Sequence, residues 1–134
     1  MNHRKFFSLI LGIILLTHLV ISPVIAVTPR WMNTQRVIVE LTYDAAIAKF
    51  EIKIIGMSGT TKIDNVDIKF YRISDNDEDL IAQWDDLSTL GTQFIFRNEV
   101  DGVQPGYTYR LAFTADVHRN GTVESLDTYD ERTY

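Results

Sequence analysis

Residues 103–115 carry the pattern that most constrains the fold of this chain. They read Val-Gln-Pro-Gly-Tyr-Thr-Tyr-Arg-Leu-Ala-Phe-Thr-Ala. Pro105 fixes φ near −65° and Gly106 accepts a positive φ, so the pair favours a turn. From Tyr107 to Val117 an apolar residue then stands at every second position, which is the period of a strand with one buried face. The pattern predicts a turn that leads into a half-buried strand over 107–117.

The rest of the chain repeats this kind of signal in short segments. Alternating apolar residues predict six more strands, over residues 37–43, 48–55, 66–71, 80–84, 92–96 and 122–129. Residues 56–62 are a loop by composition, and residues 85–88 fit either extended chain or one helical turn. Seven short strands with almost no helical period predict an all-β fold, an antiparallel sandwich of two sheets.

The connection between the last two strands has a specific turn signal. Asn120-Gly121 favours a two-residue type I′ hairpin, because both central residues of that turn need a positive φ. The strand that follows is the most polar one. Its Glu124, Asp127 and Asp130 are typical of an edge strand, where charge discourages pairing with another chain.

The stretch around Tyr109 resembles the E–F loop and F strand of fibronectin type III modules, within the immunoglobulin-like sandwiches. The resemblance covers Val103, Pro105-Gly106, Tyr109 and the alternating residues up to Ala115. It implies a tyrosine corner, in which the Tyr109 hydroxyl bonds back to the loop backbone and Val103 is the buried anchor. The tryptophan that this family usually carries near its second strand is absent, and Phe50 is the nearest aromatic residue.

The N-terminus predicts export. A short basic segment with Arg4 and Lys5 precedes an apolar run over residues 6–21, and Ser-Pro-Val-Ile-Ala ends at Ala26. This is typical of a secretory signal cleaved after Ala26. The alternative is an uncleaved anchor, because residues 6–25 approach the length that spans a bilayer. The predicted organisation is therefore a signal over 1–26, a leader over 27–34 and a sandwich domain over 35–134.

Charge and cysteine content restrict the partners. The chain has no cysteine, so no disulfide or thiolate site can form. Without the signal it keeps 11 basic residues against 18 acidic ones, a net charge of −7. That charge argues against nucleic acid and against an anionic membrane surface. We expect an unknown extracellular protein or glycan as partner, and contact with a membrane only through residues 6–25 if they are retained.

A second resemblance points the same way. Pro29-Arg30-Trp31, the loop Gly56–Lys62 and the hairpin Arg119–Thr122 are similar to segments of small cysteine-free exported proteins of Gram-positive bacteria. The resemblance implies export and a sandwich fold. It implies no activity.

Residues 75–79 are the sharpest candidate for metal chemistry. Asp75, Asp77 and Asp79 alternate, as at the start of an EF-hand calcium loop, where hard oxygen ligands suit Ca²⁺. The pattern then fails, because Leu80 stands where that loop needs glycine. We therefore predict no cofactor or metal, with these three aspartates as weak candidates for calcium beside the simpler interpretation of a solvated turn.

No catalytic constellation is evident. His118 is the only histidine after the signal, and we expect it to lie exposed beside the hairpin. A Ser-His-Asp site needs a nucleophile and a positioned base, and zinc needs three or four nitrogen or sulfur ligands. We predict no catalytic residue and no enzyme activity.

Binding is the remaining class of function. Tyr71 follows Phe70 in a strand and should face away from the core. Two or three exposed aromatic residues on one sheet face can stack on sugars or anchor a protein. The candidates are Tyr43, Tyr71, Tyr107, Tyr129, Tyr134, Trp31 and Trp84. We predict a non-enzymatic extracellular or envelope binding module. The alternatives are a secreted effector or inhibitor that acts through loop 56–62 or 75–79, and a calcium-tuned module.

Overall fold

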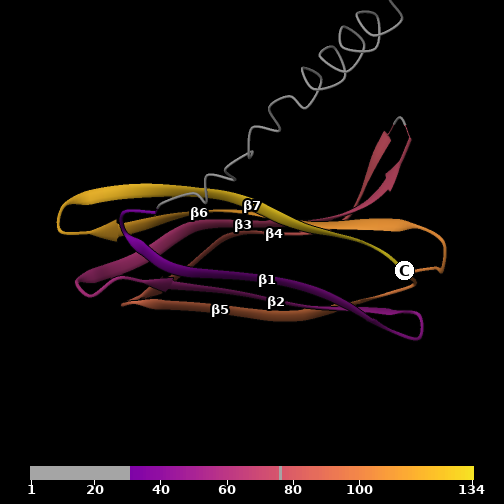
Figure 1. The fold of residues 1–134 in the computed structure, drawn as a ribbon, viewed down its shortest axis with the longest axis horizontal. Coiled ribbons are helices and arrows are strands. Elements are labelled where there is room, and N and C mark those ends of the chain that lie inside the picture. The colour runs from indigo at the N-terminus through magenta and orange to yellow at the C-terminus, as the bar shows by residue number, and fades with distance from the viewer. Residues whose placement is uncertain (1–30, 76) are drawn as a thin grey trace, which may run out of the picture.

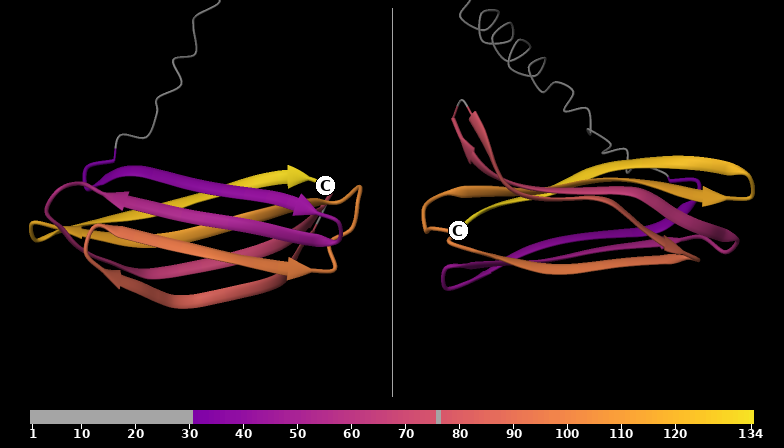
Figure 2. Two further views of the ribbon diagram at one scale, coloured as in Figure 1. Left: turned by 90° about the horizontal axis from the view of Figure 1, so that it is seen from below. Right: turned by 180° about the vertical axis from the view of Figure 1, so that it is seen from behind.

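The computed structural model describes residues 31–75 and 77–134, which form seven strands in two sheets. One sheet has the order β1-β2-β5 and the other β4-β3-β6-β7, with every pairing antiparallel. The sheets stack face to face (Figures 1 and 2), which confirms the predicted all-β sandwich. The strands are β1 (Thr34–Asp44), β2 (Ile47–Gly56), β3 (Thr60–Ser74), β4 (Asp77–Leu90), β5 (Gln93–Asp101), β6 (Thr108–Arg119) and β7 (Thr122–Thr133).

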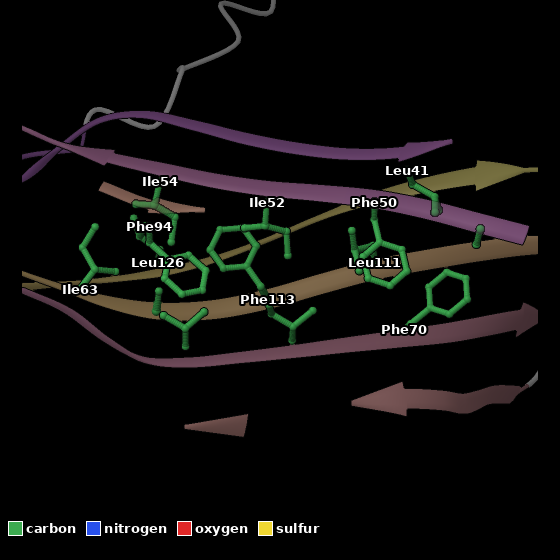
Figure 3. Close-up of a cluster of buried hydrophobic side chains, with 14 of the residues drawn as sticks. Leu41, Phe50, Ile52, Ile54, Ile63, Phe70, Phe94, Leu111, Phe113 and Leu126 are labelled. Carbon is green, nitrogen blue, oxygen red and sulfur yellow. The ribbon is translucent and has the colours of Figure 1, made fainter. Parts of the chain in front are cut away.

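The core lies between the sheets and follows the predicted alternation most closely in β2 and β6. In β2 every second side chain from Ala48 to Ile54 is buried. In β6 the same holds from Tyr109 to Val117, whereas Tyr107 lies before the strand and is exposed. Figure 3 shows side chains from the two sheets meeting in one layer, which is the arrangement that buries the apolar face of each sheet.

β3 is longer than predicted because two features escape a strict period of two. Residues 60–62, expected in a loop, already belong to β3, since Gly59 at φ 91° closes a tight turn over residues 57–59. Asn65, at φ 48°, then marks a bulge where the pairing register shifts. The bulge places Ile63 and Val66 on the same buried face although they are three residues apart.

β4 corrects two further expectations. Asp77 and Asp79, predicted in an acidic turn, are strand residues that pair with Ser74 and Arg72. Residues 85–88 continue the strand, with a bulge at Asp86 (φ 55°) instead of a helical turn. The carboxylate of Asp67 accepts the Asp86 amide at 2.9 Å, so the bulge keeps a partner for its backbone.

The β6–β7 hairpin and the edge position of β7 are as predicted. Asn120 and Gly121 both have positive φ, 50° and 78°, and β6 pairs with β7 along its whole length. Side chains of β7 close the seam to β1. The Asp130 carboxylate accepts the Leu41 amide at 3.1 Å, and Glu124 accepts the amides of Met32 and Asn33.

Opposite ends of the sandwich carry different features. At one end the Asn33 amide group donates to the Val117 carbonyl at 3.1 Å, next to the β6–β7 hairpin, and half-buried Trp31 packs against the core. At the other end Tyr134 bonds to the loop that precedes β6. The predicted signal 1–26 and the first half of the leader 27–34 lie outside the described residues. Within the described part, no helix has the length and apolarity needed to cross a bilayer.

Candidate interaction surface

The residues around Tyr109 form a structural framework. The Tyr109 hydroxyl accepts the amide of Gln104 at 2.9 Å, which is the contact that the family resemblance implies. Its ring stacks on Phe70 with centroids 5.5 Å apart, and Val103 is buried beneath the same loop. Gly106, which follows Pro105 in the turn, has φ 86°. These side chains are directed at the loop and the core, so they hold the fold together and leave the binding surface to other residues.

The three weak calcium candidates do not converge. Asp79 is engaged by Arg72, with Nη2 and Oδ2 2.5 Å apart, and this carboxylate raises the pKa of the guanidinium. Asp77 accepts the amide of Glu78 at 2.9 Å. Among residues 31–75 and 77–134, no three histidine, cysteine or acidic side chains are grouped so that they could hold a metal ion.

His118 belongs to a small polar cluster and is half-buried, whereas we expected it to be exposed. Its Nε2 lies 2.6 Å from an oxygen of Asp64, and Lys62 bonds the other oxygen. The hydrogen bond from Lys62 lowers the pKa of Asp64, and burial opposes that shift. Within the described residues no hydroxyl group bonds the imidazole. The cluster is therefore an ion pair of Lys62 and Asp64 on the sheet surface, with His118 bonded to the same carboxylate.

The aromatic residues divide between the sandwich interior, its ends and one outer face. Trp84 packs on Phe50 and Phe96, and Tyr43 stacks on Tyr134 at 4.7 Å. Tyr71 and Tyr129 instead belong to the outer face of the β4-β3-β6-β7 sheet. Tyr71 pairs with Arg110 in β6, and Tyr129 pairs with Ala112. The prediction that Tyr71 points away from the core is confirmed.

The end of the β3–β4 hairpin leaves the plane of its sheet. Phe70 pairs with Ala82 and Tyr71 with Leu80, so Ile81 is an extra residue in β4, and such a bulge bends a strand. Beyond it the hairpin projects outward, away from the other sheet (Figures 1 and 2). We call residues 71–81 the arm. An ion pair between Glu78 and Arg110 of β6 ties the arm to the sheet that it leaves.

Four side chains share the surface where the arm meets the sheet. Tyr71 and Leu80 are directly opposite on the arm, and residues opposite each other in an antiparallel pair face the same side. Arg110 pairs with Tyr71, and its guanidinium carbon lies 5.0 Å from the Tyr129 ring centroid. Tyr129 is 60% exposed and Leu80 49% exposed. We call Tyr71, Leu80, Arg110 and Tyr129 the elbow surface.

Arg110 organises the elbow surface. It lies between two carboxylates, bonding Glu131 at 2.8 Å and Glu78 of the arm, and the hydrogen bond that it donates to Glu131 is the main cause of its raised pKa. The two carboxylates hold the Arg110 guanidinium against one face of Tyr129, so the exposed ring has a fixed support. A supported aromatic ring loses little entropy when a partner packs on it.

The opposite outer face has a different character. The β1-β2-β5 sheet carries a shallow open groove of about 490 Å³. Its charges are largely paired across neighbouring strands, with Arg97 Nε 2.5 Å from Glu51 and Lys49 Nζ 2.6 Å from Asp44. Ile95 is the one exposed large apolar residue among the described residues of this face. The groove therefore presents self-paired charge and little apolar area.

Sequence reasoning included Tyr71 and Tyr129 among the aromatic candidates, but it missed Leu80 and Arg110. Arg110 and Tyr129 stand in predicted strands, and the alternation alone assigns both to an outer face. What the sequence does not provide is the register that brings them beside Tyr71, or the bulge at Ile81 that raises the arm.

Comparisons with known proteins add a likeness of fold. No protein-family model matches the chain, and no curated protein matches it in sequence. Among solved structures it is similar to the sporulation control protein Spo0M from Bacillus subtilis, with 12% identity and a TM-score of 0.46. The match covers 77% of this chain and 49% of Spo0M, so this chain spans about half the length of that protein.

Proposed function

We propose that this protein is an exported, non-enzymatic contact module that binds a protein outside the cell or in the cell envelope through the elbow surface. The observation that carries the proposal is the uneven distribution of exposed apolar side chains. Among the described residues, four of the eight large exposed ones belong to the outer face of the β4-β3-β6-β7 sheet, two of them in the elbow surface and two at the β6–β7 hairpin end, and one belongs to the opposite outer face. Those four are Leu80, Leu90, Val123 and Tyr129.

Uncovered apolar area is costly in water at roughly 25 cal/mol per Å². A concentration of it on one face is therefore typical of a contact surface. The composition of the elbow surface favours a protein over a glycan as the partner, because an aliphatic residue, two tyrosines and an arginine resemble the centre of a protein interface.

We further propose that the module is of the fibronectin type III-like kind, and separate features support this kinship and the export of the protein. The hydrogen bond from Gln104 to Tyr109 and the division into sheets of three and four strands support a fibronectin type III-like module. The signal pattern that ends at Ala26 supports export. Intact mass of the protein from the native host tests export. A species in the medium that lacks the first 26 residues supports export with cleavage. A full-length species in the membrane fraction supports a module that is anchored to the membrane by its N-terminus.

Photo-crosslinking in the native host tests the contact surface. Tyr129 is replaced by the photoreactive residue p-benzoylphenylalanine, and a matched control carries the same residue in place of Ile95, which is 43% exposed on the opposite outer face. We expect a discrete adduct after illumination from the Tyr129 position and none from the Ile95 position. Equal labelling at both positions, or no adduct at either one, contradicts the proposal.

A secreted inhibitor is the second candidate, because the ends of β3 and β4 in the arm project from the sandwich (Figure 1). An inhibitor would contact its target mainly through the arm tip, whereas the module contacts it through Tyr129. The photoreactive residue at Ser74, in the last position of β3, separates the two. A stronger adduct at Ser74 than at Tyr129 favours the inhibitor.

A further inference from the structure

The net negative charge of the described sheets is concentrated on one outer face. The outer face of the β4-β3-β6-β7 sheet has seven carboxylates and three cationic side chains, assigned by register and by the ion pairs they make. The opposite outer face has five carboxylates and four cationic side chains. The acidic excess therefore lies beside the elbow surface. The seven carboxylates are Asp64, Asp67, Glu78, Asp85, Asp116, Asp127 and Glu131.

Four of these seven carboxylates are already occupied. Asp64 binds Lys62 and His118. Asp116 accepts hydrogen bonds from the side chains of Asn65 and Ser125. Glu78 and Glu131 both bind Arg110, as described above. Because Asp116 meets only neutral donors, it keeps its charge, and the acidic excess of this face comes from Asp116 and the remaining three carboxylates.

Asp67, Asp85 and Asp127 have no cationic partner within residues 31–75 and 77–134. Asp67 and Asp127 both pair with Thr114 and so stand in one row across the sheet, about 10 Å apart at the strand spacing. Asp127 precedes Tyr129 by two residues in β7, which places it about 7 Å along the same face. Lys69, which pairs with Ala112 as Tyr129 does, makes no ion pair among the described residues. The negative charge that adjoins the exposed ring is therefore only partly compensated.

This arrangement decides between possible occupants. A second copy packed face to face would bring the row of carboxylates against its own like, which is unfavourable. An anionic polymer or membrane surface would meet the same repulsion. A cationic segment is favoured by both the carboxylate row and the exposed ring. It neutralises Asp67 and Asp127, and it can also stack a guanidinium or ammonium group on the free side of Tyr129.

We propose that the partner of this face is a basic protein segment, with an apolar or aromatic side chain at the elbow surface and lysine or arginine over the Asp67–Asp127 row. The inference rests on the proposed function and specifies its partner. The attraction between two opposite charges about 7 Å apart in water raises affinity roughly threefold. Loss of both carboxylates is then expected to weaken binding by about fivefold to tenfold.

A selection experiment tests this chemistry. The full chain is immobilised and a phage-displayed library of random linear peptides is selected on it, after which the enriched peptides are titrated against variants. D67N/D127N removes the charge and keeps the oxygen that accepts the Asp86 amide. E40Q/E99Q removes two carboxylates from the opposite face as the matched control, and Tyr129→Ser disrupts the elbow surface. Circular dichroism of each variant checks that it is folded.

We expect the enriched peptides to combine basic residues with an apolar or aromatic one. Their affinity should fall about fivefold to tenfold for D67N/D127N at low salt, stay the same for E40Q/E99Q, and decrease as NaCl is raised towards the regime where the Debye length is about 10 Å. Peptides that lose affinity with Tyr129→Ser but not with D67N/D127N overturn the basic partner and leave the contact module standing. No enrichment, or binding insensitive to both changes, overturns both proposals.

Discussion

Replacing Tyr109 by phenylalanine tests whether the corner hydrogen bond stabilises the sandwich. The hydroxyl accepts the Gln104 amide at 2.9 Å, and the residue is only 2% exposed. Phenylalanine keeps the ring and its stacking on Phe70, so the change isolates one polar contact. The Gln104 amide then loses its partner in a part-buried place, which costs about 1–3 kcal/mol.

The expected cost is a substantial part of the total stability. Domains of this size unfold with about 5–15 kcal/mol, and 1 kcal/mol moves Tm by about 4–8 °C near 100 residues. We therefore expect Tyr109→Phe to lower Tm by about 4–24 °C. Urea unfolding followed by the fluorescence of Trp84, which is half-buried against Phe50 and Phe96, measures the free energy directly.

A surface tyrosine provides the control for this measurement. Tyr129→Phe removes a hydroxyl from a residue that is 60% exposed, where water replaces any lost contact, so its free energy of unfolding should change by less than about 0.5 kcal/mol. Equal stability of the Tyr109→Phe variant and the unchanged protein refutes the argument. That result would mean that the loop amide finds water as readily as it finds the hydroxyl.

Three other predictions follow from single contacts. Burial raises the pKa of Tyr43 to about 12, helped by Tyr109 and Asp130. Because the folded pKa is raised, the stability that neutral Tyr43 contributes is complete below pH 10 and is lost as the pH rises towards 12. The Tyr43→Phe variant should therefore unfold less readily in that pH range, in an alkaline titration followed by circular dichroism. Ile52 is fully buried, and Ile52→Ala should cost about 2–5 kcal/mol in urea unfolding. Glu124→Ala removes the acceptor of two β1-end amides and should accelerate their hydrogen exchange at least several-fold, without affecting the middle of β6, by NMR.

The fold was predictable where the period of two is uninterrupted. In β2 the residues from Ala48 to Ile54 alternate without a break, and each predicted inward residue is buried. In β3 and β4 the period breaks at Asn65, Ile81 and Asp86, where bulges shift the register. A bulge is stabilised by partners from other strands, such as the Asp67 carboxylate that accepts the Asp86 amide. Sequence periodicity does not contain these partners.

The interaction surface was less predictable for a related reason. Alternation assigns Tyr71 and Tyr129 to outer faces, but the two residues are 58 positions apart in the chain and become neighbours only through two strand pairings. The guanidinium of Arg110 connects them, and its ion pair to Glu78 depends on the arm turning outward. Each of these steps is tertiary, so a local pattern indicates candidates without combining them.

The position of the elbow surface relative to the N-terminal end of the sandwich determines whether a membrane anchor would cover it. Asn33 contacts Val117 and Thr122 at the hairpin end of the sandwich, whereas Ile73 of the arm pairs with Thr108 at the other end. About ten strand residues separate these ends along β6, or roughly 30 Å at the usual rise per residue. Along β6, Val117 is seven residues from Arg110 and five from Ala112, the partner of Tyr129, so Asn33 lies roughly 17–24 Å from the elbow surface. A cleaved protein and one tethered through its N-terminus would both leave Tyr129 open to a partner, so intact mass decides where the partner is captured, and photo-crosslinking at Tyr129 applies to both forms.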